Sequence, residues 1–351
     1  DYIRERRRGQ REMFVPLAHP PGQAQADFGE ADVVIAGVME HIEEAGVHSG
    51  DSACSIPPYS LSGPVVEEIR RATHAMAKRL KVIGLMNVQF AIKREDGAMN
   101  VYVLEVNPRA SRTVPFVAKA TGVPIAKIAA KVMAGATLAE LGVTKEPIPA
   151  HVSIKESVFP FRKFVGVDIV LGPEMRSTGE VMGISERFSI AFAKAQLASG
   201  VVLPKSGRIF LSVASRHKDQ IVGLAKRLTV MGYELLATGG TARRLEEAEI
   251  PVELVKKIAE GHPNLIDHLK NEDVSLILNT PSGKGARTDE GRIRAASVQH
   301  GVPCITTIQA AEAAVKAMEA LRQEEMNVQS LQERFPSSSP VTTLPDQGSS
   351  V

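Results

Sequence analysis

Apolar and polar positions along the first part of the chain predict a mixture of helices and strands. The clearest helix spans about 64–80, where Ser62 can cap the start and Pro64 suits the first turn. A second helix is predicted at about 124–134. The apolar stripe of the first helix is Val65, Ile69, Ala72, Met76 and Leu80. Runs rich in β-branched and aliphatic residues predict extended segments at 33–39, 85–92, 100–106 and 152–158.

After residue 208 the pattern changes to a regular alternation of apolar runs and amphipathic stretches. The predicted strands are "RIFLSVA", "YELLAT", "PVELV", "VSLILN" and "VPCIT". Helices are predicted near 217–231, from 241, near 289–299 and at about 309–323. Such an alternation favours a parallel sheet with helices on both faces. We therefore expect a small doubly wound α/β domain over 208–323, joined by a linker, "LPKSGR", to a first domain over 32–203.

The two ends of the chain differ from these domains in composition. Residues 1–31 are basic and are interrupted by "AHPPGQ", which cannot continue a regular element. Residues 324–351 contain "FPSSSPVTTLPDQGSSV", and this composition predicts a disordered tail.

Composition limits the class of protein. With 351 residues, 44% of them hydrophobic, the chain can form two globular domains. The formal net charge of +2 gives no overall bias toward nucleic acid or membranes, so we expect neither a specific nucleic-acid partner nor a membrane partner. Cys54 and Cys304 are too few for a disulfide framework. No apolar run is long enough to span a membrane, and a cytoplasmic protein is predicted.

Candidate chemistry lies in the segment "NVQFAIKREDGAMNVYVLEVNPRASRT", which predicts a β-hairpin turning at "REDGAM". Side chains alternate across a strand, so Glu105 and Asn107 project to the same face, and Gln89 on the other arm can lie across from them. Two or three hard oxygen donors fit a magnesium site that holds polyphosphate. Arg109 and Arg112 would add bidentate contacts to phosphate.

A structural explanation of the same residues is open at this point. Glu105 and Arg109 can form an ion pair on an edge strand, and the Asn107–Pro108 step can simply end that strand. Glu-x-Asn alone is a weak signal.

Longer stretches around the hairpin resemble the C-terminal half of the carbamoyl-phosphate synthase large chain. The resemblance runs from about residue 32 to 200 and includes "MEHIEEAGVHSGDSACSIPPYSLS", "LEVNPRASRTVPFVAKATGVP", "LGPEMRSTGEVMG" and "AFAKAQLASG". It implies a partial ATP-grasp fold, in α+β class with a largely antiparallel sheet. It also implies a ligase that uses ATP and Mg²⁺ or Mn²⁺ to phosphorylate carbamate to carbamoyl phosphate, for pyrimidine and arginine biosynthesis.

The resemblance assigns expected roles to residues by position. Gln89, Glu105 and Asn107 match metal ligands, and Gln89 and Glu105 also match ATP contacts. Arg109 and Arg112 match residues near the transferring phosphate. A nucleotide-contacting segment is matched by Gly46, Val47, His48 and Ser49. Positions that bind ornithine as an effector are matched by Glu43, Asp51 and Glu156. By itself, a histidine such as His48 is more often a loop or core residue than a catalytic one.

In the second domain, "ATGGTARR" follows a predicted strand and opens a helix, where glycines and free N–H groups suit an anion. Residues 208 to about 322 resemble the methylglyoxal-synthase-like regulatory domain of the same large chain, which implies binding of nucleotide monophosphates such as UMP or IMP. The matching positions are Ser212, Lys218, Thr238, Gly240, Thr241, Lys257, Asn279 and Ser282. One departure is "NTPSG" in place of the family's "NTTSG", because Pro281 removes a hydroxyl and an N–H.

Two alternatives exist for this domain. A methylglyoxal synthase would need the catalytic aspartate of "GGDQ", and "GKGARTDEG" stands in its place. A structural lid with a vacant pocket would leave Lys218 and Lys257 as ordinary solvated lysines.

The first residues resemble a different family. "RERRRGQREMFVPLAHPPGQAQADFGEA" resembles the segment entering the core of integrase-type insertion-sequence transposases, where Asp27 would be the first metal-binding acid. Two-metal nuclease chemistry needs further carboxylates nearby. These would lie in transposase sequence that is not present here, so we expect a fusion or truncation scar and no transposition.

The resemblances imply partners and limits. In the family the partners are a glutaminase small chain and other large-chain copies. An earlier subdomain and a mobile lid normally clamp ATP from the opposite side, and neither is matched here. We therefore expect that this chain cannot make carbamoyl phosphate alone. One alternative is a module that binds nucleotide monophosphate beside an inactive ATP-grasp relic. Another is an exposed sheet edge that pairs with a second copy of the chain.

Overall fold

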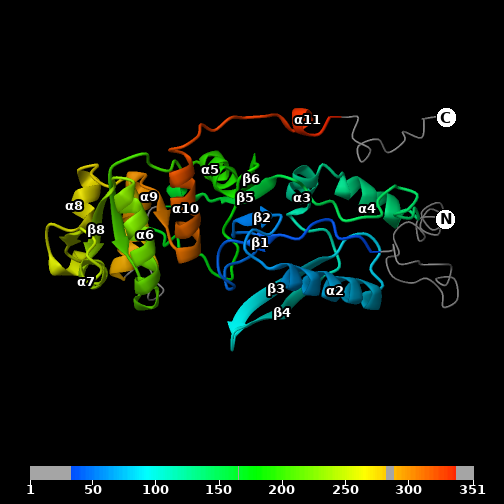
Figure 1. Ribbon diagram of the computed structural model, residues 1–351, viewed down its shortest axis with the longest axis horizontal. Coiled ribbons are helices and arrows are strands. Elements are labelled where there is room, and N and C mark those ends of the chain that lie inside the picture. Colours follow the sequence, from blue (N-terminus) through cyan, green and yellow to red (C-terminus); the bar gives the residue numbers. More distant parts are fainter. Residues whose placement is uncertain (1–32, 165, 282–287, 337–351) are drawn as a thin grey trace, which may run out of the picture. The chain divides into compact units, whose positions relative to one another are not determined.

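The computed structural model describes residues 33–164, 166–281 and 288–336 (Figure 1). Within these ranges the chain forms two compact units. Unit 1 contains 33–37, Leu61–Ile148 and 330–336, whereas unit 2 contains Val38–Ser60 and Pro149–Gln329. The boundary between the compact units thus differs from the boundary at 203–208 that the sequence predicts.

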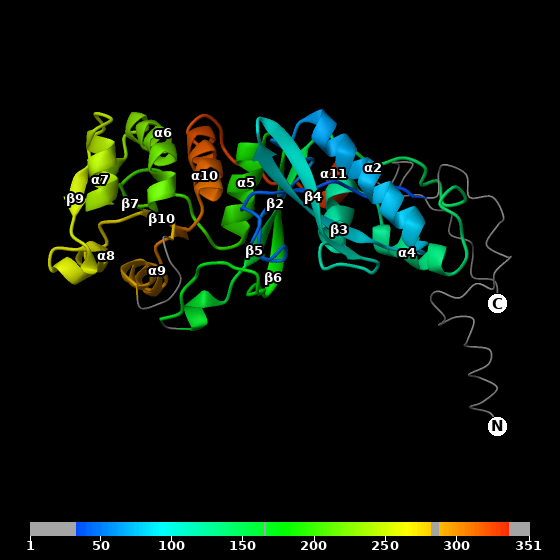
Figure 2. The ribbon, with the colours of Figure 1, turned by 90° about the horizontal axis from the view of Figure 1, so that it is seen from below.

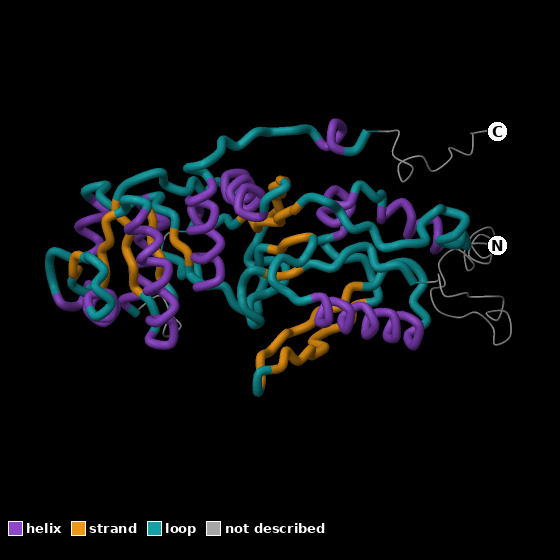
Figure 3. Tube along the Cα trace, viewed as in Figure 1, coloured by secondary structure: helices purple, strands orange, loops and turns teal. Residues whose placement is uncertain are grey.

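Unit 1 consists of helices and a two-stranded antiparallel sheet. Its elements are α2 (Gly63–Leu80), β3 (Asn87–Glu95), β4 (Ala98–Asn107), α3 (Val114–Thr121), α4 (Ile125–Met133) and α11 (Leu331–Arg334). Strands β3 and β4 form a long hairpin, and α2 contacts β4 (Figure 3). The predicted helices at 64–80 and 124–134 and the predicted hairpin are confirmed, whereas the two-turn helix α3 was not predicted.

Helix α2 differs from its prediction at both ends. Ser62 has an extended backbone and makes no side-chain hydrogen bond to the helix, although Pro64 does occupy the first turn. Val65 and Ile69 of the predicted apolar stripe are buried, but Leu80 is 49% exposed. Ala72 and Met76 are partly buried, so the burial of the stripe decreases toward the C-terminal end of the helix.

Unit 2 begins with a four-stranded antiparallel sheet in the order β1-β2-β5-β6. The strands are β1 (Glu40–His41), β2 (Cys54–Ile56), β5 (Val152–Val158) and β6 (Gly179–Ser185), and helix α5 (Phe188–Ala198) packs on β5 and β6. The prediction of β5 is confirmed. The extended segment predicted at 33–39 is wrong, because no strand forms there and pairing begins at β1.

The sequence pattern missed β2, β6 and α5 for identifiable reasons. Strand β2 has only three residues, and β6 carries Gly179 and Gly183, which weaken a strand signal. Helix α5 has buried residues on most of its circumference, including Ile190, Phe192 and Ala195, so it shows no amphipathic stripe.

The second sheet of unit 2 is parallel and five-stranded, in the order β11-β10-β7-β8-β9. Its strands are β7 (Arg208–Ser212), β8 (Glu234–Thr238), β9 (Glu253–Val255), β10 (Leu276–Asn279) and β11 (Cys304–Ile305). The helices are α6 (Lys218–Val230), α7 (Gly239–Glu246), α8 (Leu265–Lys270), α9 (Asp289–His300) and α10 (Ile308–Ala320). All five predicted strands and the four predicted helices are confirmed, and α8 is an addition.

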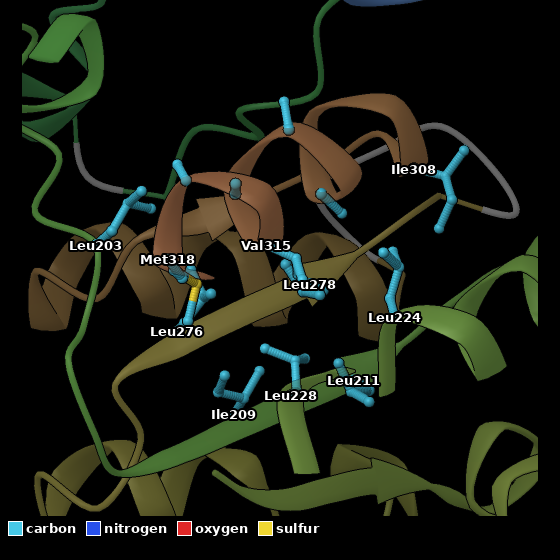
Figure 4. Packing of buried hydrophobic residues seen from close by; sticks show 14 of the residues in the cluster. Leu203, Ile209, Leu211, Leu224, Leu228, Leu276, Leu278, Ile308, Val315 and Met318 are labelled. Carbon is cyan, nitrogen blue, oxygen red and sulfur yellow. The ribbon is translucent and has the colours of Figure 1, made fainter. Parts of the chain in front are cut away.

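Alternate side chains of the central strands pack against helices on opposite faces of this sheet. Ile209, Leu211 and Leu278 join the cluster that includes α6, α7 and α10 (Figure 4). Phe210 and Ile277 point the other way and pack with residues of α8 and α9. Figure 2 shows α6 and α10 on one side of the sheet and α9 on the other. The doubly wound architecture predicted from the alternation is therefore present.

The predictions for the chain ends have different outcomes. Residues 1–31 and 337–351 lie outside the described residues, as does Ser282. Within the predicted disordered tail, Leu331–Arg334 forms the short helix α11, which Ser330 and Glu333 cap reciprocally. The tail prediction is therefore wrong for this segment. Among the residues that the structure describes, no helix combines the length and the apolar character needed to cross a membrane.

Candidate functional site

The β3–β4 hairpin brings three predicted metal ligands onto one face. Its ladder places Gln89 directly opposite Glu105 and Asn87 opposite Asn107, with an irregularity between Gln89 and Phe90. Residues opposite each other, and those two positions apart, share a face. The Asn107 Nδ2 group donates a short hydrogen bond to Glu105 Oε1, so these two side chains are in contact.

The two arginines beyond β4 lie near the end of this face. Arg109 is exposed; its backbone N–H donates to the Asn107 carbonyl oxygen at 2.9 Å, and its Nη1 donates to the Ala110 carbonyl oxygen. Arg112 is also exposed. The ion pair between Glu105 and Arg109, the structural alternative, is not among the ion pairs of the described residues.

The donor set of the hairpin fits a hard divalent cation that is shared with a ligand. One carboxylate and two amide oxygens suit Mg²⁺ or Mn²⁺, and such ions usually complete their shell with phosphates and water. Among the described residues, no group of three or more histidines, cysteines and acids forms an all-protein metal cage. To bind through oxygen, Asn107 has to turn its Nδ2 group away from Glu105.

The segment Gly46–Ser49 lies in unit 2, and its backbone is held by two neighbouring elements. The His48 N–H donates to the Gly172 carbonyl oxygen at 2.7 Å, and Lys155 Nζ donates to the Ser49 carbonyl oxygen at 3.1 Å. His48 Nδ1 accepts from the Gly50 N–H at 3.0 Å. The imidazole therefore stabilises its own turn through Nδ1, which leaves Nε2 as the nitrogen that can face a ligand.

Asp51 has a structural function. Its side chain is 1% exposed, and its two carboxylate oxygens accept the backbone N–H groups of Arg176 at 2.7 Å and Ser177 at 2.9 Å. The Gly50 carbonyl oxygen also accepts the hydroxyls of Ser157 and Ser177. Asp51 thus joins its turn to the segment that precedes β6.

Glu43 and Glu156, the other positions expected to bind ornithine, form an acidic pair. Burial, followed by the charge of Glu43, raises the pKa of Glu156 to about 8, although the Ser157 N–H, Lys155 and Gln196 oppose the shift. Burial also raises the pKa of Glu43, whose carboxylate accepts from Ser52 Oγ at 2.6 Å. Two carboxyls that resist ionisation together favour a cationic ligand.

The expected effector site of the second sheet gathers hydroxyls at the carboxyl ends of β7 and β8. Ser212 Oγ and Thr238 Oγ1 are 3.1 Å apart, and Thr241 Oγ1 accepts the Val213 N–H at 3.2 Å. Thr238 occupies the cap position of α7 without a side-chain cap hydrogen bond. Hydroxyls and helix N–H groups at this edge suit the phosphate of a nucleotide.

The remaining expected effector residues are placed differently. Lys218 Nζ lies 2.9 Å from where a Cβ on Gly240 would be, so this lysine covers the start of α7. Lys257 is exposed. Asn279 is fully buried; its Nδ2 donates to the Ser212 carbonyl oxygen and its Oδ1 accepts from Arg294. The amide of Asn279 is therefore fixed between Ser212 and Arg294.

Two buried cations and one partly exposed carboxylate around these sites belong to no motif of the sequence. Lys155 and Arg294 are completely buried, and Asp168 pairs with Arg294. No motif predicts them, because their burial follows from packing between segments that are distant in sequence.

A cavity of about 40 Å³ lies beside the Gly46–Ser49 segment in unit 2. Its lining includes Val47, Leu171, His217 and Thr307. This volume holds a water molecule or two. The cavity is therefore too small for a nucleotide.

Two family models match the chain. "Carbamoyl-phosphate synthase L chain, ATP binding domain" matches residues 26–141, a range that contains the hairpin and the Gly46–Ser49 segment. "MGS-like domain" matches residues 220–306, which contain Thr238, Thr241 and Asn279. The resemblance of the first residues to a transposase stays a prediction.

Two curated relatives carry a name that agrees with the first of these models. The chain is 72% identical over 304 residues to the carbamoyl phosphate synthase large chain of Rhodopirellula baltica, and 54% identical over 301 residues to that of Myxococcus xanthus. These matches cover 87% and 86% of the chain but only 28% and 27% of the relatives. The biotin carboxylase domain of a thermophilic 2-oxoglutarate carboxylase is 18% identical with a TM-score of 0.35, covering 48% of the chain and 42% of that structure.

The sheets described above agree with these assignments. The antiparallel strands fit a partial ATP-grasp domain, and the parallel sheet with helices on both faces fits the MGS-like domain. The chain therefore belongs to the carbamoyl phosphate synthase large chain family and corresponds to the C-terminal portion of that protein.

Proposed function

We propose that the chain supplies part of the site that phosphorylates carbamate with ATP and Mg²⁺ or Mn²⁺, giving carbamoyl phosphate for pyrimidine and arginine biosynthesis. The observation that carries this proposal is the β3–β4 register, which sets Gln89 opposite Glu105 with Asn107 in contact. Three oxygen donors on an exposed sheet face suit a metal–nucleotide complex better than a structural ion pair.

The proposed roles of the residues follow from their chemistry. Glu105, Asn107 and Gln89 would hold the cation through oxygen atoms, and the cation, when bound, would offset charge on the phosphates. Arg109 and Arg112 would contact the transferring phosphoryl group, where guanidinium groups stabilise the charge that develops in the transition state. The Gly46–Ser49 segment would contact the nucleotide through backbone groups. Positioning and electrostatics would supply the catalysis, with no covalent nucleophile.

We further propose that the chain makes no carbamoyl phosphate alone, since it spans about 28% of the length of its relatives. The test is an assay of the purified chain with ATP, bicarbonate, ammonia and Mg²⁺. We expect no carbamoyl phosphate above background, and we expect turnover when a large chain lacking these residues is added. Turnover by the chain alone would refute the proposed dependence. No turnover in the mixture would refute the proposed function.

A second function is proposed for the MGS-like domain, which would bind a nucleotide monophosphate such as UMP or IMP. The hydroxyls of Ser212, Thr238 and Thr241 at one edge of the sheet, with Lys218 beside Gly240, support it. Calorimetric titration should give saturable binding that Lys218→Ala and Thr241→Ala each weaken by about tenfold, the scale of one charge-assisted contact. Lys226→Ala, an exposed lysine on the same helix α6, is the matched control. Absence of binding would leave the inert lid as the better explanation.

Glu43 and Glu156 support a separate proposal, that a cationic amino acid such as ornithine binds to unit 2. A ligand ammonium group would stabilise both carboxylates in their ionised form. The glutaminase small chain and other large-chain copies are proposed as partners through the family, and the cytoplasmic location stays a prediction.

A further inference from the structure

Arg294 belongs to none of the motifs that the sequence indicates as functional. Arg294 lies on α9 and is fully buried. Its Nη1 donates to Asn279 Oδ1 at 2.8 Å. Asn279 in turn donates from Nδ2 to the carbonyl oxygen of Ser212 at 3.2 Å. The guanidinium therefore fixes the orientation of an amide that is hydrogen-bonded to Ser212, a residue of the proposed nucleotide monophosphate site.

The opposite edge of the same guanidinium binds Asp168, in the segment between β5 and β6. Arg294 Nε donates to Asp168 Oδ1 at 2.6 Å, and Arg294 Nη2 donates to Asp168 Oδ2 at 2.8 Å. This bidentate geometry is rigid and directional, unlike a point-charge contact from lysine. Burial acts to raise the pKa of Asp168, but the hydrogen bonds from Arg294 and the Val170 N–H, together with the charges of Arg294 and Arg176, outweigh it, so the pKa lies below its ordinary value. Asp168 is thus held ionised.

Asp168 belongs to the segment 168–177, which lies between β5 and β6. Two other residues of this segment donate hydrogen bonds to Asp168. Asp168 Oδ1 also accepts the Val170 N–H at 3.1 Å, and the Asp168 carbonyl oxygen accepts from Arg176 Nη1 at 2.6 Å. Loss of the pair with Arg294 would therefore release the start of this segment.

Further along, segment 168–177 holds the turn at 48–51, in which His48 and Ser49 are expected to contact ATP and Asp51 is expected to bind ornithine. The Gly172 carbonyl oxygen accepts the His48 N–H at 2.7 Å. The N–H groups of Arg176 and Ser177 both donate to the carboxylate of Asp51. A continuous series of hydrogen bonds thus runs from Ser212 through Asn279, Arg294 and segment 168–177 to the turn at 48–51.

We propose that Arg294 is a positioning residue that couples the nucleotide monophosphate site to the turn at 48–51. The proposal rests on the proposed function of the MGS-like domain as an effector site. A phosphate that draws the Asn279 Nδ2 group from the Ser212 carbonyl oxygen also moves Asn279 Oδ1. Arg294 Nη1 would then be left unpaired in a buried site, which is costly, so the guanidinium follows and carries Asp168 with it.

The first test measures hydrogen–deuterium exchange of the ligand-free chain. Arg294→Lys keeps the positive charge but cannot make the bidentate contact. We expect it to speed exchange at least threefold in peptides covering 46–53 and 168–178. Arg292→Lys, an exposed arginine on the same helix, is the matched control and should leave both peptides unchanged. Equal exchange in the two variants would overturn the proposal.

The second test adds saturating UMP or IMP. In the unsubstituted chain we expect slower exchange both at 238–245 and at 46–53. In Arg294→Lys we expect protection at 238–245 to remain and protection at 46–53 to disappear. Protection of both segments in this variant would refute the coupling and leave the proposed function intact. No protection at 238–245 in the unsubstituted chain would refute the proposed function and the coupling together.

Because Arg294→Lys could fail to fold, a second variant tests the same pair from the carboxylate side. Asp168→Asn preserves volume at a side chain that is 16% exposed, and it should reproduce the exchange pattern of Arg294→Lys. Circular dichroism establishes whether each variant is folded. If both variants are unfolded, the pair is required for folding and the positioning role is refuted.

Discussion

Gln89 lies directly opposite Glu105 in the β3–β4 hairpin, and Asn107 donates its amide to the same carboxylate. Gln89 and Glu105 lie on different strands, and the turn at "REDGAM" brings the two strands together. The polar triad is thereby concentrated on one face of the hairpin, at the end away from the turn. Metal binding by these residues can be tested by comparing a substitution within the triad with one at the turn end of the hairpin.

Glu105→Ala should weaken Mn²⁺ binding in the presence of ATP by roughly tenfold or more, because a carboxylate is the only anionic ligand of the proposed set. Electron paramagnetic resonance of free Mn²⁺ measures this. Glu95→Ala is the control, since Glu95 is a carboxylate at the turn end of the same hairpin and pairs with Lys93. Equal Mn²⁺ affinity of the two variants would exclude the triad as a metal site.

Gly183→Ala should destabilise unit 2 by about 3 kcal/mol, the scale of severe overpacking. A Cβ at this position would lie 2.1 Å from the Ala191 carbonyl oxygen, so β6 and α5 would have to separate. Gly179→Ala is the control on the same strand, because its Cβ would meet Val158 at an ordinary 3.8 Å. Urea denaturation followed by circular dichroism gives both values. Equal stability of the two variants would contradict the close approach of β6 to α5.

The stability of unit 2 should fall as the pH rises from 6.5 to about 8. Burial is the main cause that raises the pKa of Glu156 to about 8, so the folded state binds a proton that the unfolded state has released. Its contribution is complete below the unfolded pKa of about 4.5 and is lost as the pH rises through 8. One proton gives a slope of at most about 1.4 kcal/mol per pH unit.

Glu156→Gln should reduce this slope, and the exposed Glu174→Gln should not. His41, whose pKa burial lowers to about 4, makes a contribution of opposite sign that ends about one pH unit above its unfolded pKa of 6.5, so the slopes are compared above about pH 7.5. Burial also raises the pKa of Glu43, so the Glu156→Gln variant should retain part of the pH dependence of stability. Denaturation curves at several pH values measure the slopes, and an unchanged slope in Glu156→Gln would contradict the shifted pKa.

Pro281→Thr should tighten binding of UMP or IMP by about fivefold, the scale of one hydrogen bond. The substitution restores a hydroxyl and an N–H directly after Thr280, whose own hydroxyl is held by the Ala214 N–H and His217. Calorimetry compares the two chains. Weaker binding by the threonine variant would indicate that proline shapes the pocket for a different ligand.

Much of the fold was predictable because it depends on local patterns. The hairpin follows from alternation around a turn, and the strands after residue 208 follow from apolar runs between amphipathic helices. The polar triad of the hairpin was found for the same reason. The period-two geometry of a strand already places Glu105 and Asn107 on one face.

Tertiary structure alone decided which segments are neighbours. The strand order β11-β10-β7-β8-β9, the close approach of Gly183 to Ala191 and the contacts of Arg294 with Asn279 and Asp168 all join positions that no local pattern relates. Sequence periodicity specifies an element and the face it buries, whereas the partner of that face is chosen by packing over the whole unit. A buried charge such as Arg294 is stable only after that packing supplies its carboxylate and amide, and its function could not be inferred before the fold was known.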